Sequence, residues 1–386
     1  MLNMIGILVV LCFYTLHIRC TTSENDISGL QSLFDTANGA SWYYYGGVPW
    51  VFNNVSDPCM DGWYGVTCNG CTNATICRVS GLSLDSFRLY GYIAEEFCNL
   101  SVVSTLSFSS NTLDKTVPGC LWEISSLAYL DLSHNYFVGA LPNFTASHGN
   151  FSYLDLSNNY LTGSVPTSIS WLTAMEYLSF YSNSFTSEVP SSIGSLQLLT
   201  YLDIGSNHFD RSIPVELFSM VQLRYLSLQI NSMSGMLPAE VSLLSFLTYL
   251  NLEYNVMEGK IPTSIGELSL LVSLEFNNNM FNSSLPSEFG NLGAATRIDV
   301  STNSLSGSIP SAIGNLGSVV VLDLDTNNLS GELPESIGSL TSLKSLYVSR
   351  NQLVGTIPSA LSNNTALSGL YMMDNLFTGS VFEWCI

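Results

Sequence analysis

Two sets of side chains that could do chemistry recur along this chain at positions separated by 24 residues or its multiples. One set consists of tyrosines and the other of acids. The tyrosines are Tyr129, Tyr153, Tyr177, Tyr201, Tyr225 and Tyr249, and the acids are Asp131, Asp155, Asp203, Glu275, Asp299 and Asp323. A tyrosine offers stacking area and a hydroxyl group, which suits contacts with peptides and sugars. A row of carboxylates suits a basic ligand or a divalent cation.

Both sets also have an interpretation that involves no ligand. The tyrosines are compatible with a consensus residue that packs against its neighbours from turn to turn. Like charges on adjacent strands repel each other, so the repulsion among Glu275, Asp299 and Asp323, which recur at successive 24-residue intervals, must be offset. We expect hydration by solvent to offset it, with nearby Arg297, a bound divalent ion or a basic peptide as alternatives.

Enzyme chemistry finds little support in the sequence. It contains no G-x-G-x-x-G, P-loop, H-E-x-x-H or G-x-S-x-G motif. The histidines outside the first 20 residues are His134, His148 and His208, and His134 and His208 are too far apart in the repeat to share a metal ion. Acids along an open face lack the cleft of a glycosidase. We therefore predict no catalytic residues, no metal site and no cofactor.

Regularly spaced asparagines indicate which structural elements position the tyrosines and the acids. Asparagine recurs every 24 residues from Asn111 to Asn375 without an insertion, and a proline follows seven residues after each one except the last. A fixed period over most of a chain is the signature of stacked repeats. In one turn, Leu346 and Val348 flank Tyr347 in a strand-like alternation, and Asn351 follows at a bend. The carboxamide of an asparagine can satisfy backbone groups left open inside such a bend.

This pattern resembles the plant-type leucine-rich repeat. The segments from Leu130 to Asn135 and from Gly307 to Leu316 carry its two halves, L-x-L-x-x-N and G-x-I-P-x-x-I-G-x-L. The resemblance implies an α/β-type solenoid of about thirteen 24-residue coils, with a parallel β-sheet on the concave face. Phe87 then takes the asparagine position of the first coil. Tyrosines on adjacent strands are expected ~5 Å apart on the concave face.

The N-terminal part resembles the cap of these repeats. Residues 24–80 combine helical spacing of apolar residues with a C-x-W-x-G-V-x-C-like segment, in which two extra residues precede Trp63. The resemblance implies a small helical cap, with residues 81–386 forming the solenoid. It also implies a disulfide between Cys59 and Cys68. Two further pairs are expected: Cys71 with Cys77, which enclose a short loop, and Cys98 with Cys120, which would tie adjacent coils.

Several features predict a secreted or cell-surface protein. Residues 1–20 contain a short apolar run typical of a signal peptide, with an uncleaved anchor as the alternative, and no later stretch is long enough to span a membrane. Glycosylation sequons begin at Asn54, Asn73, Asn99, Asn143, Asn150, Asn282, Asn328 and Asn363. The thirteenth coil stops without a full C-terminal cap, and Cys385 is the expected unpaired cysteine.

The charge balance narrows the class of partner. The net charge is −20, which argues against binding nucleic acid through phosphate contacts and favours cationic partners. Because the resemblance extends to receptor-like protein ectodomains and to secreted proteins of protists and bacteria, it implies a module that binds a protein or peptide on the concave face. A carbohydrate ligand, an inhibitor of a secreted hydrolase and a structural surface glycoprotein are the alternatives.

Overall fold

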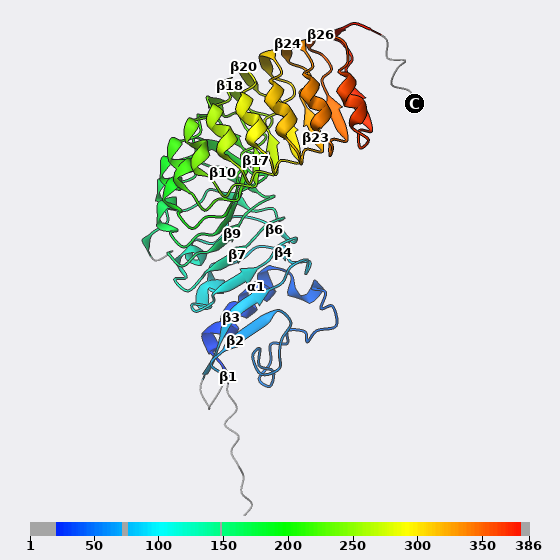
Figure 1. Cartoon of the computed structure of the whole chain (residues 1–386). Helices are drawn as coiled ribbons and strands as arrows, with labels where there is room; N and C mark the ends of the chain where they lie inside the picture. The colour runs from blue at the N-terminus through cyan, green and yellow to red at the C-terminus, as the bar shows by residue number, and fades with distance from the viewer. Residues whose placement is uncertain (1–20, 72–75, 147–148, 380–386) are drawn as a thin grey trace, which may run out of the picture.

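A computed structural model describes residues 21–71, 76–146 and 149–379, and these residues form one curved solenoid (Figure 1). The leader at residues 1–20, the sequon at Asn73 and Cys385 lie outside the described residues. Within the described ranges, no helix is long and apolar enough to cross a membrane.

The main sheet lies on the concave side, and one strand from each of thirteen coils contributes to it. All neighbouring coil strands are parallel, and from β5 onward each residue aligns with the residue 24 positions later, as Tyr177 does with Tyr201. The strands are β3 (Ile76–Ser83), β5 (Thr105–Ser107), β7 (Tyr129–Asp131), β9 (Tyr153–Asp155), β11 (Tyr177–Ser179), β13 (Tyr201–Asp203), β15 (Tyr225–Ser227), β17 (Tyr249–Asn251), β19 (Ser273–Glu275), β21 (Arg297–Asp299), β23 (Val321–Asp323), β25 (Ser345–Tyr347) and β27 (Gly369–Tyr371). The solenoid and its concave parallel sheet match the fold expected from the repeat.

A second set of short parallel strands follows the asparagine bends along one lateral edge. It consists of a pair, β4 (Tyr90–Gly91) and β6 (Thr112–Leu113), and two longer groups. The first group is β8 (Val138–Gly139), β10 (Tyr160–Gly163), β12 (Ser184–Ser187) and β14 (His208–Phe209). The second group is β16 (Ser234–Gly235), β18 (Val256–Lys260), β20 (Met280–Ser284), β22 (Ser304–Ser308), β24 (Asn328–Glu332), β26 (Gln352–Gly355) and β28 (Leu376–Phe377).

The convex side is built from short 3-10 helices rather than α-helices. They are η2 (Glu95–Asn99), η3 (Gly119–Glu123), η5 (Thr167–Trp171), η6 (Ser191–Ser195), η7 (Val215–Ser219), η8 (Ala239–Leu243), η9 (Thr263–Glu267), η10 (Ser287–Asn291), η11 (Ser311–Asn315), η12 (Glu335–Ser339) and η13 (Ser359–Asn363). Each of these helices after η2 begins directly behind a repeat proline, such as Pro190 before η6. Proline suits this position because it has no N–H to leave unpaired at the start of a helix.

The repeat asparagines tie each coil to the one before it. The side-chain oxygen of Asn207 accepts a hydrogen bond from the Phe185 N–H at 2.9 Å. Its amide nitrogen donates to the carbonyls of Phe180 and Ile204 at 2.9 and 3.2 Å. The same contacts recur in the other coils. The side-chain oxygen of Asn111 accepts hydrogen bonds from the N–H groups of Phe87 and Leu89. Phe87 therefore occupies the asparagine position of the first coil, as expected.

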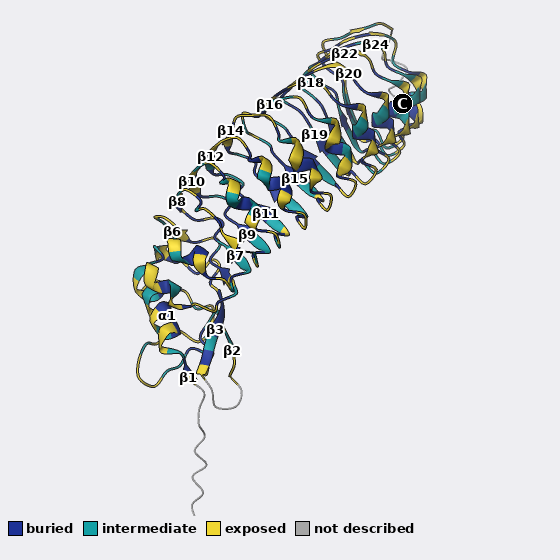
Figure 2. Cartoon of the chain, turned by 90° about the vertical axis from the view of Figure 1, so that its left-hand side faces the viewer, coloured by how far each residue is buried: buried dark blue, intermediate teal, exposed yellow. Residues whose placement is uncertain are grey.

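The core runs along the whole solenoid between the main sheet and the 3-10 helices. In every coil before that of β27 the two inward strand residues are buried, as Leu130 and Leu132 are in the coil of β7, whereas Leu370 and Met372 in the last coil are partly buried. Figure 2 shows these buried segments as a continuous inner stripe flanked by exposed turns. A single coil cannot bury its leucines alone, whereas stacked coils share one linear core.

The cap packs helix α1 (Glu24–Thr36) against the first coil. It also contains β1 (Thr21–Thr22), β2 (Val66–Asn69), which is antiparallel to β3, and η1 (Gly39–Ser41). Asp26 on α1 is fully buried and forms a bidentate pair with Arg78 on β3, with both N–O distances at 2.9 Å. Trp42, Trp50 and Trp63 form an aromatic cluster beside it.

Candidate functional site

Six half-buried tyrosines form one row on the concave face, and we call this row the tyrosine strip (Tyr129, Tyr153, Tyr177, Tyr201, Tyr225 and Tyr249). Neighbouring rings are stacked nearly parallel, with centroid distances of 4.2–4.4 Å and interplanar angles of 3–11°. Because the strands pair in register, the sheet itself sets this spacing. The strip ends at Ser273, which takes the tyrosine position in the next coil.

The hydroxyl groups of the strip remain protonated hydrogen-bond donors. Burial, reinforced by neighbouring carboxylates, raises the pKa of all six phenols above the usual value. The Tyr177 hydroxyl lies 3.4 Å from Asp155 Oδ2, and the Tyr249 hydroxyl accepts a hydrogen bond from Asn251 at 3.1 Å. The strip therefore combines an apolar ring surface with a row of donors at its border.

The acid column (Asp131, Asp155, Asp203, Glu275, Asp299 and Asp323) runs beside the strip, and three of its six members are buried while the other three are partly exposed. Asp155, Asp203 and Asp299 are only 8, 6 and 5% exposed. The aspartates cap the bend after their own strand. Each accepts a hydrogen bond from the N–H two residues later, for example from Gly205 to Asp203 at 2.9 Å. The carboxylates thus satisfy backbone groups in addition to lining the concave face.

Arg297 offsets the repulsion in the second half of the acid column. Its guanidinium donates to Asp299 at 2.7 Å, and its Nε lies 3.7 Å from Glu275. Arg350 pairs with Asp325 at 3.2 Å, one position farther along the face. The sequence left several ways open to offset the repulsion between these carboxylates. For Glu275 and Asp299, the structure shows that the guanidinium of Arg297 does so.

Two carboxyl groups of the column titrate in a mildly acidic range. Burial is the main cause that raises the pKa of Asp203 to about 6. Burial and the neighbouring Asp299 raise the pKa of Asp323 to about 6 as well. Burial also raises the pKa of Asp131. The charge of the concave face therefore changes near pH 6.

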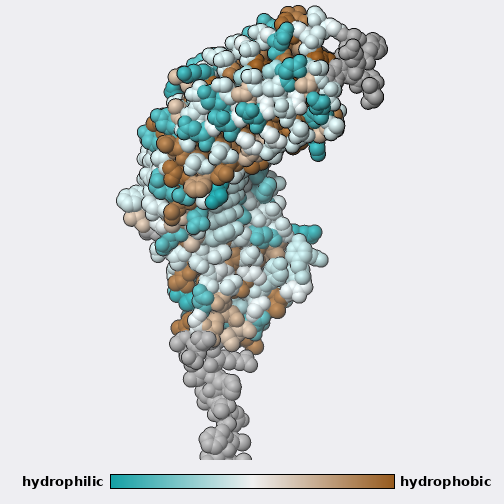
Figure 3. Space-filling model, in the orientation of Figure 1, coloured by the Kyte–Doolittle hydropathy of each residue, from teal (hydrophilic) through white to brown (hydrophobic). Residues whose placement is uncertain are grey.

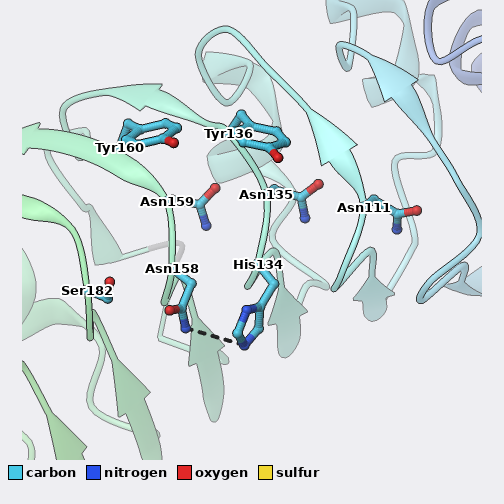
Figure 4. Close-up of a pocket in the computed structure, with 8 residues that line it drawn as sticks. All are labelled: Asn111, His134, Asn135, Tyr136, Asn158, Asn159, Tyr160 and Ser182. Atoms are coloured by element: carbon cyan, nitrogen blue, oxygen red, sulfur yellow. Dashed lines mark hydrogen bonds between the residues drawn. The ribbon is translucent and has the colours of Figure 1, made fainter.

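Sequence reasoning missed a hollow at the lateral edge next to this face. It has a volume of about 340 Å³ and is lined by Asn111, His134, Asn135, Tyr136, Asn158, Asn159, Tyr160 and Ser182. Figure 4 shows the Tyr136 and Tyr160 rings on one side and the linked pair of His134 and Asn158 on the other. The two rings stack with their centroids 5.9 Å apart. Successive tyrosines directly after two repeat asparagines were the available signal.

A second tyrosine pair also escaped the sequence analysis. Tyr347 and Tyr371 take the acid-column position in two successive coils, and their rings stack with centroids 4.4 Å apart. They lie near the end of the described solenoid, beyond Asp323. The acid column therefore gives way to aromatic surface in these coils.

The disulfides in the described part of the chain lie in the cap and the first two coils. The structure joins Cys59 to Cys68, Cys71 to Cys77 and Cys98 to Cys120. The clusters of possible metal ligands found in the described ranges consist of these bonded cysteines, with Glu95 added in one case. The sequon asparagines that the structure describes (Asn54, Asn99, Asn143, Asn150, Asn282, Asn328 and Asn363) are all exposed.

Comparisons with known proteins agree with this geometry. The family model described as "Leucine rich repeat" matches residues 294–353, and a second "Leucine Rich Repeat" model matches residues 126–147 and 150–172. The curated protein STRUBBELIG of Arabidopsis thaliana is 28% identical over 103 residues, which cover 26% of this chain and 12% of that protein.

Solved receptor structures match over a larger part of the chain. The Arabidopsis receptor kinase HAESA, solved with the peptide hormone IDA and the co-receptor SERK1, has a TM-score of 0.78 and 29% identity. The match covers 93% of this chain and 59% of that chain. The complex PEPR1-AtPEP1 has a TM-score of 0.78 and 30% identity, covering 92% of this chain and 52% of that one. The chain thus spans little more than half of these receptor chains.

The asparagine ladder, the concave parallel sheet and the disulfide-bonded cap occur together with matches to both repeat models and to plant receptor ectodomains. The matched segments are leucine-rich repeats, and the chain as a whole is similar to plant receptor-like ectodomains built from such repeats.

Proposed function

We propose that this protein is an extracellular recognition module, without enzymatic activity of its own, that binds a protein or peptide on its concave face. The observation that carries the proposal is the tyrosine strip. Six rings in register expose a continuous half-buried aromatic surface with hydroxyl donors along one border. Tyrosine is enriched at binding surfaces because it adds contact area and a hydrogen bond at a low cost in conformational entropy.

The similar receptor structures support a polypeptide as the partner. HAESA was solved with a peptide hormone and a co-receptor, and PEPR1 was solved with AtPEP1. A polypeptide also suits the local chemistry, because its carbonyl groups accept hydrogen bonds from phenols that stay protonated. The net charge of −20 favours a partner that is basic overall.

The acid column contributes to this preference unevenly. Asp299 is tied to Arg297 and to Ser301, so little of its charge is free for a partner. Glu253 and Asp325 point outward one position farther along and are partly exposed. Asp325 is paired with Arg350 at 3.2 Å, whereas Glu253 accepts a hydrogen bond only from the neutral amide of Asn277 at 3.1 Å among the described side chains. A basic group of the ligand is therefore expected beside Glu253.

The test uses the secreted chain as bait in extracellular fluid from its source. Tyr177→Ser, Tyr201→Ser and Tyr225→Ser are combined in one variant, since serine already stands at the same position in residues 273 and 345. The matched control replaces the other stacked pair, Tyr136 and Tyr160, by serine. We expect a polypeptide that binds the wild type and the control, and whose affinity for the strip variant falls at least about tenfold.

The identity of the captured molecule separates the alternatives. A peptide or membrane protein that depends on the strip supports recognition. A hydrolase whose activity falls on binding would establish an inhibitor instead, and a polysaccharide would establish a carbohydrate ligand. Equal binding to the strip variant and to the wild type would contradict the proposed site.

A further inference from the structure

The residue before each repeat asparagine is held in the left-handed backbone region. Its φ lies between 50 and 56° in all thirteen coils, and most of these residues are Ser, Asn, Asp, His or Thr. The exceptions are Ile230, at φ 51°, Tyr254, at φ 50°, and Arg350, at φ 51°, and the first two stand in successive coils. A β-branched or bulky side chain is poorly suited to this region, so folding alone does not favour either residue.

Both residues are exposed, and two further exposed apolar residues belong to the same and the next coil. Val256 and Met280 occupy the position directly after the asparagine in two successive coils. The exposed fractions of Ile230, Tyr254, Val256 and Met280 are 45, 54, 42 and 47%. We call these four residues the apolar edge. The face shown in Figure 3 also carries hydrophobic residues in separate patches.

Backbone contacts place the coils of the apolar edge next to one another. The Ile230 N–H donates to the Glu253 carbonyl at 2.9 Å, and the Tyr254 N–H donates to the Asn277 carbonyl at 3.1 Å. Met280 aligns with Glu258 on the neighbouring strand β18. In these two series of positions, the neighbours before and after the four apolar residues are Ser206 and Asn278, and Ser232 and Ser304. Polar residues thus bound the edge on both sides, which is typical of a docking surface.

The charges next to the apolar edge indicate the kind of partner. Glu253 directly precedes Tyr254, and exposed Glu258 lies beside Met280. The Oδ1 atom of Asn277 is a buried acceptor with no donor among the described residues, and its amide nitrogen donates to Glu253 at 3.1 Å. Lys260 lies farther along β18, aligned with Asn282. The two carboxylates suit an ammonium or guanidinium group.

We infer that the apolar edge docks a polypeptide that presents a large apolar side chain flanked by lysine or arginine. The apolar side chain packs against Ile230 and Tyr254, and the basic groups face Glu253 and Glu258. This surface differs from the tyrosine strip. Tyr225 and Tyr249 belong to the same two coils but lie at the start of the main-sheet strands, five residues before Ile230 and Tyr254.

The combined variant Ile230→Asn and Tyr254→Asn separates docking from folding. Asparagine already stands at this position in residues 158 and 278, where it adopts φ 56°. Because asparagine tolerates the left-handed region, the melting temperature of the variant should not fall below that of the wild type. We expect it to rise by on the order of 2 °C. The matched control, Thr302→Asn with Thr326→Asn, makes the same change at two coils outside the edge.

The binding probe is a phage-displayed library of random peptides selected on the secreted, glycosylated chain. We expect peptides with a large apolar residue next to lysine or arginine, which bind the matched control variant as well as the wild type. Their affinity for the edge variant should fall at least about tenfold. Asn282→Gln removes a sequon close to Met280 on β20. When the wild type and the edge variant both carry this change, the affinity of the peptides for the edge variant should fall by the same factor, because the peptides contact the side chains and not a glycan.

Three results would overturn the inference. One is that the enriched peptides bind the edge variant and the wild type equally. Another is that they carry no excess of basic residues. The third is that the edge variant melts below the wild type, which would show that Ile230 and Tyr254 serve folding. Peptides selected in this way should still bind the strip variant with serine at 177, 201 and 225, so this test and that of the concave site can fail independently.

Discussion

At the scale of single residues, the carboxylates of the acid column both support the bends and respond to pH. Asp203 caps its bend through the Gly205 N–H and is only 6% exposed. Burial raises its pKa to about 6, above the ordinary value near 3.9. A carboxyl group whose pKa is raised by folding contributes most to stability when it is protonated. That contribution is present below about pH 4 and is lost as the pH rises through about 6.

Asp203→Asn tests this relation. Asn251 occupies the same column and caps the Glu253 N–H at 2.8 Å, so an asparagine preserves the bend. At pH 7 the variant should be more stable than the wild type by about 2 kcal/mol, because it avoids burying a charge. At pH 4 the difference should largely disappear. Melting temperatures of both proteins at the two pH values measure the effect, with exposed Asp210→Asn as the control. A pH-independent difference would contradict the assigned cause.

At the scale of elements, the cap depends on one buried ion pair between α1 and β3. Asp26 is fully buried, contacts the Arg78 guanidinium through both oxygens and accepts the Val79 N–H at 2.8 Å. These three hydrogen bonds satisfy a charge that would be costly to bury alone. The pair therefore fixes how the helix covers the apolar end of the first coil.

Asp26→Ala should loosen the cap before the rest of the solenoid. Removing one partner of a buried pair costs about 3–5 kcal/mol, because it leaves the other partner without its counter-ion. Trp42, Trp50 and Trp63 lie in the cap, so tryptophan fluorescence during urea unfolding should show a transition at lower urea than circular dichroism does. Glu24→Ala, at an exposed position of the same helix, is the control. Coincident transitions in the Asp26 variant would show that the pair does not act locally.

The coil itself could largely be predicted from the sequence, because the repeat is local and strict. The asparagine interval predicted the coil length, and the alternation around each leucine pair predicted which residues face outward. The stacked tyrosines follow directly from these two facts. The left-handed residue before each asparagine could not be predicted in this way, because Ile230 and Tyr254 are residue types that normally avoid it.

The environment of the acids depended on contacts that the repeat does not specify. Hydration was expected for Asp299, which is instead only 5% exposed and accepts the Ser301 N–H at the bend after its strand. The sequence indicated Arg297 as one of several groups that could offset the repulsion between the carboxylates. Only the side-chain geometry shows that it contacts both Glu275 and Asp299.

At the scale of the whole molecule, the solenoid separates two surfaces with different chemistry. The tyrosine strip covers six coils of the concave sheet, and the apolar edge covers three coils along the lateral border. Each coil packs mainly on its neighbours, so a local substitution leaves distant coils intact. A net charge of −20 gives both surfaces the same electrostatic preference for a basic partner.

Site-specific photo-cross-linking tests the central claim, recognition on the concave face, most directly. A photoreactive phenylalanine analogue replaces Tyr201 on the strip in one protein and exposed Val215 on the convex side in another. Both proteins are irradiated in the same extracellular fluid, and the products are identified by mass spectrometry. The account predicts that a discrete polypeptide is attached at position 201 and not at position 215. Equal labelling at both positions, or labelling at position 215 alone, would contradict it.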